Sequence, residues 1–177
     1  MYEAKENMLK IKNYSSENKS EYATSLMVSA VKNDMLKKME ISRNKGRGGW
    51  WEKDCSSELL WNLIYEHVDK EDYVDVMNLI GMLAFKESRK ESVDNFYEMM
   101  SSNSNKSVNI FSDESMVNNI INELEKYLDQ FPNQESWFND SFDIENMKNE
   151  LRGSLHSKGW VFLFNLSAMI HMKQHAA

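Results

Sequence analysis

Helix-breaking residues are scarce in this chain, since its 177 residues include one proline and six glycines. Thirteen methionines, with many leucines, lysines and glutamates, favour helix over sheet. Cysteine is nearly absent too. Because Cys55 is the only cysteine, the chain has neither an intrachain disulfide nor a zinc site built from several cysteines. We therefore expect an all-α protein of a reducing compartment, the cytoplasm.

Long apolar runs are also lacking. The longest one covers residues 160–164, whereas a membrane-spanning helix needs about 20 apolar residues. The first twelve residues alternate charged and apolar side chains and contain no apolar run of signal-peptide length. The sequence therefore predicts neither a membrane span nor a secretion signal.

The apolar residues that are present, 41% of the chain, suffice for a hydrophobic core. Their spacing of three to five residues predicts a helical bundle of about six to seven helices. We expect helices from Ser20 to Ser42, from Asp54 or Ser56 to Val68, from Glu71 to Lys86, from a capping box at Ser88 to Met100, from Asp113 to Phe131, from Asp140 or Ser141 to Leu151, and from Ser157 onward. The last helix is apolar nearly all round, which predicts that it is the central element of the C-terminal half.

Polar clusters predict the domain organisation. Residues 1–19 end in a polar stretch typical of a flexible segment, and the serine- and asparagine-rich residues 101–112 are typical of a linker. We therefore expect two helical lobes, covering residues 20–100 and 113–177.

Charge is distributed unevenly along the chain, whose formal net charge is −7. Residues 37–47 carry five basic side chains and one acid, whereas residues 113–150 carry ten acids and two lysines. The negative total argues against general attraction to nucleic-acid phosphates. Rows of carboxylates in the second segment can instead imitate phosphates and occupy a basic groove on another protein. Ordinary solvated helix faces are the alternative interpretation.

Aromatic residues next to charges predict two contact patches, because interface hot spots favour this composition. The first patch comprises Trp137, Phe138, Asp140 and Asp143, and the second comprises Arg47, Trp50 and Trp51. The glycines around Arg47 also admit a single-stranded nucleic-acid site, where arginine contacts phosphate and tryptophan stacks on a base. In the simpler alternative, both tryptophans cover the core and Arg47 is exposed.

Residues 45–83 resemble a known sequence module. Residues 45–50 (KGRGGW), Cys55 with Ser56, and residues 66–79 (EHVDKEDYVDVMNL) together resemble a short module of uncharacterised tailed-phage and prophage proteins, which here spans residues 45–83. The module usually has glycine where this chain has Glu71, so we expect a tighter or more helical turn there. The first six residues resemble the start of an anti-CRISPR protein. The resemblance implies a phage-encoded protein in a bacterial host, which inhibits a host defence complex such as a CRISPR effector.

The module sometimes accompanies phage nucleotide pyrophosphohydrolases, whose paired carboxylates bind Mg²⁺ from separate helices. The alternative site would use Glu66, Asp69, Asp72 and Asp75, since each pair has the i, i+3 spacing that places two carboxylates on one helix face. These pairs would have to meet across a tight corner. In the simpler interpretation, Asp69 lies in the turn and Asp72 caps the next helix.

Three further residues are candidates for reactive groups or metal ligands. His171 and His175 have the i, i+4 spacing of a metal pair, but we expect a solvated, frayed terminus. Cys55 precedes a helix whose dipole could lower its thiol pKa, but no base partner can be assigned, so we expect a packed or capping cysteine. The sequence predicts no catalytic residue and no cofactor.

Overall fold

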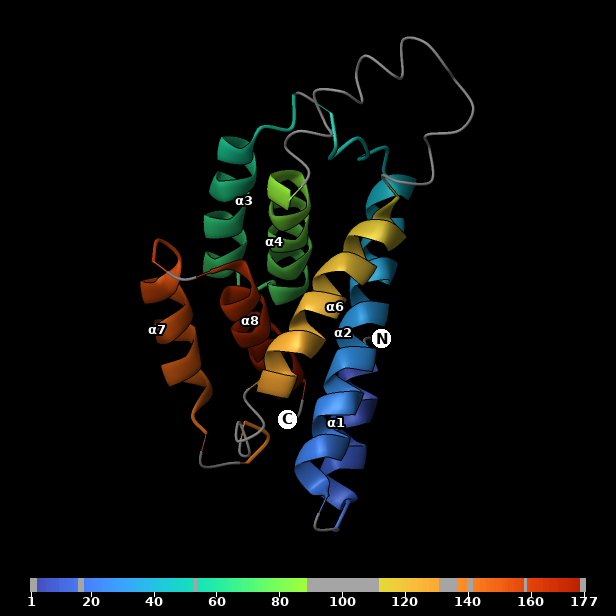
Figure 1. Cartoon of the computed structure of the whole chain (residues 1–177), viewed down its shortest axis with the longest axis vertical. Helices are drawn as coiled ribbons and strands as arrows, with labels where there is room; N and C mark the ends of the chain where they lie inside the picture. The colour runs from blue at the N-terminus through green and yellow to red at the C-terminus, as the bar shows by residue number, and fades with distance from the viewer. Residues whose placement is uncertain are drawn as a thin grey trace.

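The computed structural model describes residues 3–15, 18–52, 54–88, 112–130, 137–139, 142–157 and 159–175. These ranges form seven helices and contain no strand, which confirms the all-α prediction. The helices are α1 (Glu3–Asn13), α2 (Lys19–Asn44), α3 (Ser57–Asp69), α4 (Tyr73–Ser88), α6 (Asp113–Gln130), α7 (Ile144–Ser154) and α8 (Trp160–Gln174) (Figure 1). Each of these helices is too short or too polar to cross a membrane.

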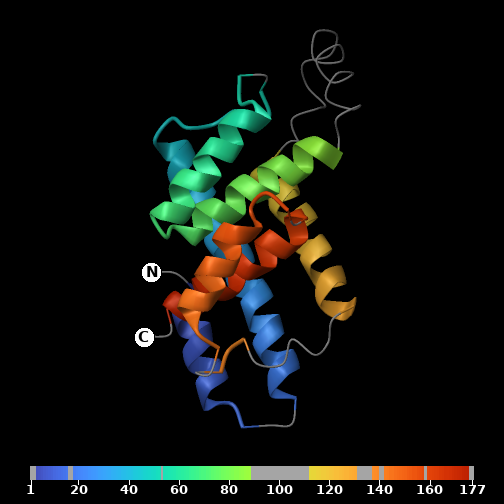
Figure 2. The ribbon, with the colours of Figure 1, turned by 90° about the vertical axis from the view of Figure 1, so that its left-hand side faces the viewer.

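Helices α4 and α8 form the centre of the bundle. Both are buried along most of their length, and they pack on one another. Helix α3 covers one side of α4, α2 and α6 cover another, and α7 packs on α8 (Figures 1 and 2). The last helix, expected at the centre of the C-terminal half, also packs on helices of the N-terminal half, because no single neighbour could cover its apolar surface.

Gly81 sets how closely α4 approaches α6. A Cβ atom at this position would lie 2.6 Å from Sδ of Met116 on α6. No real Cβ atom approaches a neighbour so closely, so the missing side chain is what lets the two helices meet at this point.

The structure corrects the prediction for the N-terminal segment. Residues 3–13, expected to be flexible, form α1, which packs on α2. Ala4, Met8 and Ile11 are buried in this contact. Their spacing of four and three residues places them on one helix face, which supplies enough apolar surface to hold the helix in place.

The two-lobe division is also corrected. Helices on both sides of the expected linker share one core, because α6 packs on α2 and α4 and α8 packs on α4. Residues 101–111 and the helix predicted after Ser88 lie outside the described residues.

The residues that cap the helix starts agree with the prediction for α3 and differ from it for α6 and α7. Ser56 caps α3 as expected, and its hydroxyl accepts a hydrogen bond from the Leu59 amide at 3.1 Å. Ser112, rather than Asp113, caps α6, since its hydroxyl accepts from the Ser115 amide at 3.0 Å. Helix α7 begins later than predicted, after Asp143, which bonds the amide two residues on.

Candidate functional site

The corner between α3 and α4 is built by a helix-terminating turn. The amides of Glu71 and Asp72 donate to the carbonyls of Val68 and His67 at 3.1 and 3.0 Å, and Glu71 has a left-handed φ of 55°. This is the Schellman arrangement, in which a residue of positive φ ends the helix. The turn is therefore left-handed, which corrects the more helical turn expected at Glu71, and it explains why glycine suits this position.

Four side chains converge where this turn meets α2, and we call them the acidic corner: Lys38, His67, Asp72 and Asp75. The Lys38 ammonium lies 2.8 Å from Oδ2 of Asp72 and 3.2 Å from Oδ2 of Asp75. Nδ1 of His67 lies 3.5 Å from the same Asp75 oxygen. All four side chains are mostly buried. One ammonium therefore lies between two carboxylates and offsets part of their mutual repulsion.

Burial and neighbouring charges shift the pKa values of Asp72 and Asp75 in opposite directions. Burial raises the pKa of Asp75, and the neighbouring Asp72 charge raises it further. Burial acts on Asp72 too, but the hydrogen bond and charge of Lys38 outweigh it and lower the pKa of Asp72. The same carboxylates raise the pKa of Lys38 against the effect of its burial. When the pair takes up a proton, that proton therefore belongs on Asp75.

The acidic corner contains half of the predicted Mg²⁺ ligands. His67, Asp72 and Asp75 each offer a ligand atom within 4.8 Å of the others. Glu66 and Asp69 are exposed on the other side of the turn, where Glu66 pairs with Lys70. The four carboxylates are therefore not brought together, and Lys38 supplies the positive charge that a divalent ion would bring. This donor set does not fit the two-helix Mg²⁺ site of the pyrophosphohydrolases.

Glu71 joins the corner to α7. Its carboxylate accepts from the buried Lys148 ammonium at 2.8 Å, and Arg152 lies 3.8 Å away. Lys148 also pairs with Glu145 at 2.8 Å. Glu71 thus anchors α7, because it offers a carboxylate to Lys148 where glycine would offer no side chain.

The glycine turn before α3 matches the simpler of its two interpretations. Trp50 is 6% exposed, packs edge-on against Phe85 and donates from Nε1 to Oδ1 of Asp113 at 2.9 Å. Trp51 is partly buried beside it, and Arg47 is exposed. The burial of Trp50 leaves little ring surface for stacking on a base, so only Arg47 and part of Trp51 remain accessible.

Lys86 holds this turn against α4. Its ammonium donates to the carbonyls of Trp50 at 2.9 Å and Glu52 at 3.1 Å, and also to that of Cys55. Burial raises the pKa of the Cys55 thiol. The pKa of Cys55 is therefore not lowered, because desolvation of the thiolate outweighs the charge of the nearby Lys86 ammonium.

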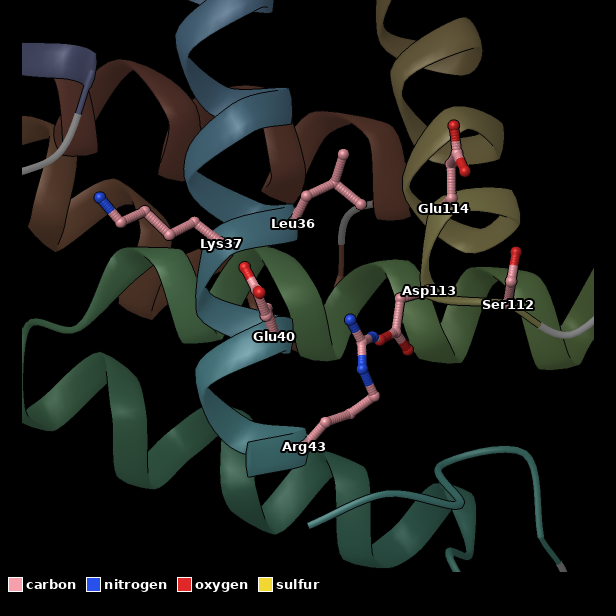
Figure 3. A pocket seen from close by; sticks show the side chains of 7 residues that line it. All are labelled: Leu36, Lys37, Glu40, Arg43, Ser112, Asp113 and Glu114. Atoms are coloured by element: carbon pink, nitrogen blue, oxygen red, sulfur yellow. The ribbon is translucent and has the colours of Figure 1, made fainter. Parts of the chain in front are cut away.

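A polar groove lies beside this turn, between α2 and the start of α6 (Figure 3). Arg43 of α2 pairs with the buried Asp113 in its floor, and Glu40 and Glu114 lie along its walls. The lining carries both signs of charge. Because of this mixed charge, the groove has no preference for either an anionic or a cationic ligand, and its charged groups serve the Arg43–Asp113 ion pair.

The C-terminal contact patch is only partly accessible. Trp137 is 2% exposed, and its carbonyl accepts from the Lys173 ammonium at 3.1 Å. Phe138 is partly buried, with the Lys19 ammonium 5.7 Å from its ring centre. Asp143 is exposed but serves as the α7 cap, and Asp140 lies outside the described residues. Trp137 is therefore a core residue in this structure.

Helix α6 presents the clearest acidic surface. Glu114, Glu125 and Asp129 are exposed and form no ion pair with a described residue. Their numbers fall on one helix face, together with Asn118 and Asn122; we call the three acids the α6 acidic face. The α6 lysine, Lys126, pairs with Glu123 instead, at 2.7 Å.

His171 is buried and His175 is half-buried at the end of α8, which corrects the prediction of a solvated, frayed end. His171 is 2% exposed, and its Nε2 lies 2.9 Å from Oδ2 of Asp34, which is as deeply buried. The His175 ring meets that of His171 edge-on at 4.9 Å, and burial followed by the His171 charge lowers the pKa of His175.

Some of these residues escaped the sequence-based prediction. Lys38 and Asp34 come from α2, and only the packing of distant helices brings them to their partners. Comparison with protein-family models, with curated protein sequences and with solved structures found no match to this chain.

Proposed function

We propose that this protein is a binding protein that presents the α6 acidic face to a basic surface of another protein. The observation that carries the proposal is the exposure of Glu114, Glu125 and Asp129 along one helix, where none of them forms an ion pair with a described residue. An exposed row of carboxylates attracts a surface that binds phosphates.

Stability alone does not explain this row. Asp129 lies in the last turn of α6, which has no basic residue. An acid there faces the negative end of the helix dipole, and the i, i+4 spacing to Glu125 adds like-charge repulsion. Each effect costs a few tenths of a kcal/mol or more. Charges kept at such a position are better explained by contact with a cationic partner.

The resemblance of residues 45–83 to phage and prophage proteins supports a particular partner class. A phage protein with an acidic surface fits the inhibition of a host defence complex, and a CRISPR effector, with its basic nucleic-acid channel, is the most suitable example. Catalysis is not needed for this role. We accordingly propose that the chain acts in the host cytoplasm as an inhibitor that competes with nucleic acid.

The test is affinity capture from bacterial lysate, quantified at two salt concentrations. A variant with Glu125→Lys and Asp129→Lys is compared with wild type and with a control variant, Glu21→Lys and Asp54→Lys. The control reverses two exposed acids elsewhere and has the same net charge. We expect a basic, nucleic-acid-binding protein that wild type and control retain and that the α6 variant loses by about tenfold.

Added DNA or RNA and higher salt should release the same protein from the wild type, since all three compete for one electrostatic contact. Equal retention by the α6 variant and the control would refute the α6 acidic face as the binding surface. Circular dichroism of both variants verifies that the helices persist.

A further inference from the structure

Four aromatic rings form a continuous column on the face of α3 next to the start of α8. The Trp61 ring centre lies 4.9 Å from that of Trp160 and 6.0 Å from that of Tyr65. The column continues to His156, whose ring centre lies 5.4 Å from that of Tyr65 and whose Nδ1 lies 3.0 Å from the tyrosine hydroxyl. Trp61, Tyr65 and Trp160 are partly buried, and His156 is exposed.

The column does not belong to the core stripe of α3. Leu60, Ile64 and Val68 form that stripe and are each at most 1% exposed. Trp61 and Tyr65 each follow a stripe residue by one position, so they lie about 100° further around the helix. They rest on the edge of the core and keep part of each ring in solvent.

Carboxylates border the column. Glu58 and Asp69 lie on the same stripe of α3 as the two aromatics, one turn before Trp61 and one turn after Tyr65. The Glu87 carboxylate of α4 accepts a hydrogen bond from Nε1 of Trp160 at 2.6 Å, which fixes it at the edge of that ring. All three acids are exposed, and none forms an ion pair with a described residue.

We infer that this surface binds an arginine-bearing segment of a protein partner. It consists of Trp61, Tyr65, Trp160 and Glu87, and we call it the α3–α8 aromatic surface. A guanidinium plane stacks on an indole or phenol face while its N–H groups reach a carboxylate at the ring edge. Glu87 is held at such an edge by one oxygen, which leaves the other to accept from arginine.

Charge selects this occupant over others. Glu58, Asp69 and Glu87, three exposed carboxylates, repel nucleic-acid phosphate, so base stacking on the same rings is disfavoured. Lysine pairs with carboxylates but lacks the planar group that stacks. The inference deepens the proposed binding function and rests on it for the class of partner, a basic protein. The further content is that the partner's contact residue is arginine, and that this arginine binds the α3–α8 aromatic surface and not the α6 acidic face.

The test uses three synthetic peptides of alternating glycine with arginine, lysine or citrulline. Nuclear magnetic resonance of the tryptophan indole N–H groups follows their binding to the full chain. We expect the arginine peptide to shift the Trp61 and Trp160 signals and to bind at least about threefold tighter than the lysine peptide. The citrulline peptide, which is planar but uncharged, should bind much more weakly.

Two variants and one control separate this surface from general acidity. Glu87→Gln keeps the exposed position while removing the charge, and should weaken arginine-peptide binding several-fold; Trp61→Leu should abolish the preference over lysine. The α6 variant, Glu125→Lys with Asp129→Lys, should keep the Trp61 response, so failure of the α6 proposal and failure of this one are distinguishable. Equal affinity for the lysine peptide, or Trp61 and Trp160 signals that do not move, would overturn the inference.

Discussion

Asp34 and His171, 137 residues apart in the chain, meet in the core with 2.9 Å between Oδ2 and Nε2. Asp34 also caps α1 from outside that helix, because its carboxylate accepts from the amides of Glu3 at 2.8 Å and Ala4 at 3.2 Å. One buried carboxylate therefore joins α1, α2 and α8. Although burial raises its pKa, the His171 hydrogen bond and the Glu3 amide outweigh that effect, so the pKa of Asp34 is lowered.

Replacing this carboxylate should destabilise the protein strongly. For Asp34→Asn we expect a loss of about 3 kcal/mol in the free energy of unfolding at pH 7, since a buried pair loses its charge and α1 loses an anionic cap. Urea denaturation measures the loss. The exposed Asp54→Asn serves as control and should change stability by less than about 0.5 kcal/mol. A similarly small effect at Asp34 would contradict the role of this pair.

The Asp34 contribution should depend on pH in a defined direction. A carboxylate whose pKa is lower in the folded state stabilises the fold above its unfolded pKa of about 3.9, and this contribution disappears as pH falls through the folded value. The difference between wild type and Asp34→Asn should therefore be constant from neutral pH to about pH 5 and shrink below pH 4. Urea titrations at several pH values provide the measurement, and a difference that grows on acidification would refute the assignment.

Gly81 and Gly153 should respond oppositely to alanine. Both lie within helices, where alanine is intrinsically better by about 1 kcal/mol. At Gly81 the new methyl group would clash with Met116, whereas nothing lies within 4 Å at Gly153. We expect Gly81→Ala to destabilise by about 1–3 kcal/mol and Gly153→Ala to stabilise by up to about 1 kcal/mol. Thermal or urea unfolding of the two variants tests this, and a Gly81→Ala variant as stable as wild type would show that the Met116 side chain moves aside at little cost.

The left-handed turn at Glu71 predicts a difference between two small substitutions. Glu71→Gly and Glu71→Ala both remove the ion pair with Lys148, but only alanine keeps a Cβ at a φ of 55°. The glycine variant should therefore be more stable than the alanine variant by about 1 kcal/mol in urea denaturation. Equal stabilities would indicate that the backbone relaxes to another conformation.

Removing the shared ammonium of the acidic corner should introduce a pH dependence. In Lys38→Met, Asp72 and Asp75 face each other without the ammonium between them, so the raised pKa of Asp75 should rise further. A raised folded pKa means that the stability present at low pH is lost as pH increases through it. We expect a loss of about 2 kcal/mol at pH 7 and a smaller loss at pH 5.

Urea denaturation at the two pH values measures this change, with the exposed Lys45→Met as control. The control should behave alike at both pH values. An equal loss at pH 5 and pH 7 for Lys38→Met would mean that Asp72 and Asp75 do not interact across the corner.

The helical class and most helix positions were predictable because local spacing determines them. Leu60, Ile64 and Val68 recur every four residues, and Ser56 stands where a cap is favoured, so the start of α3 followed from nearby residues. The same local signal is present in α1, where Ala4, Met8 and Ile11 are spaced as on one helix face. The polar residues that follow α1 led to the prediction of a flexible segment instead.

The ionic contacts were not predictable, because they join residues far apart in sequence. Asp34 lies within the buried stripe of α2, between Val31 and Met35. A charge inside an apolar stripe indicates a buried partner but does not identify it. His171 had one apparent partner, His175, four positions away, and its actual partner was set by the packing of α8 against α2. The burial of Trp50 and Trp137 depended on the same tertiary packing.

Because α2 and α4 are covered by α6 and α8, neither end of the chain carries a complete core of its own. A chain divided between α4 and α6 would yield two fragments, each with an uncovered apolar face that fits the other. Each fragment would need the other to cover its apolar face. We therefore expect neither fragment to fold alone and the two to associate when mixed.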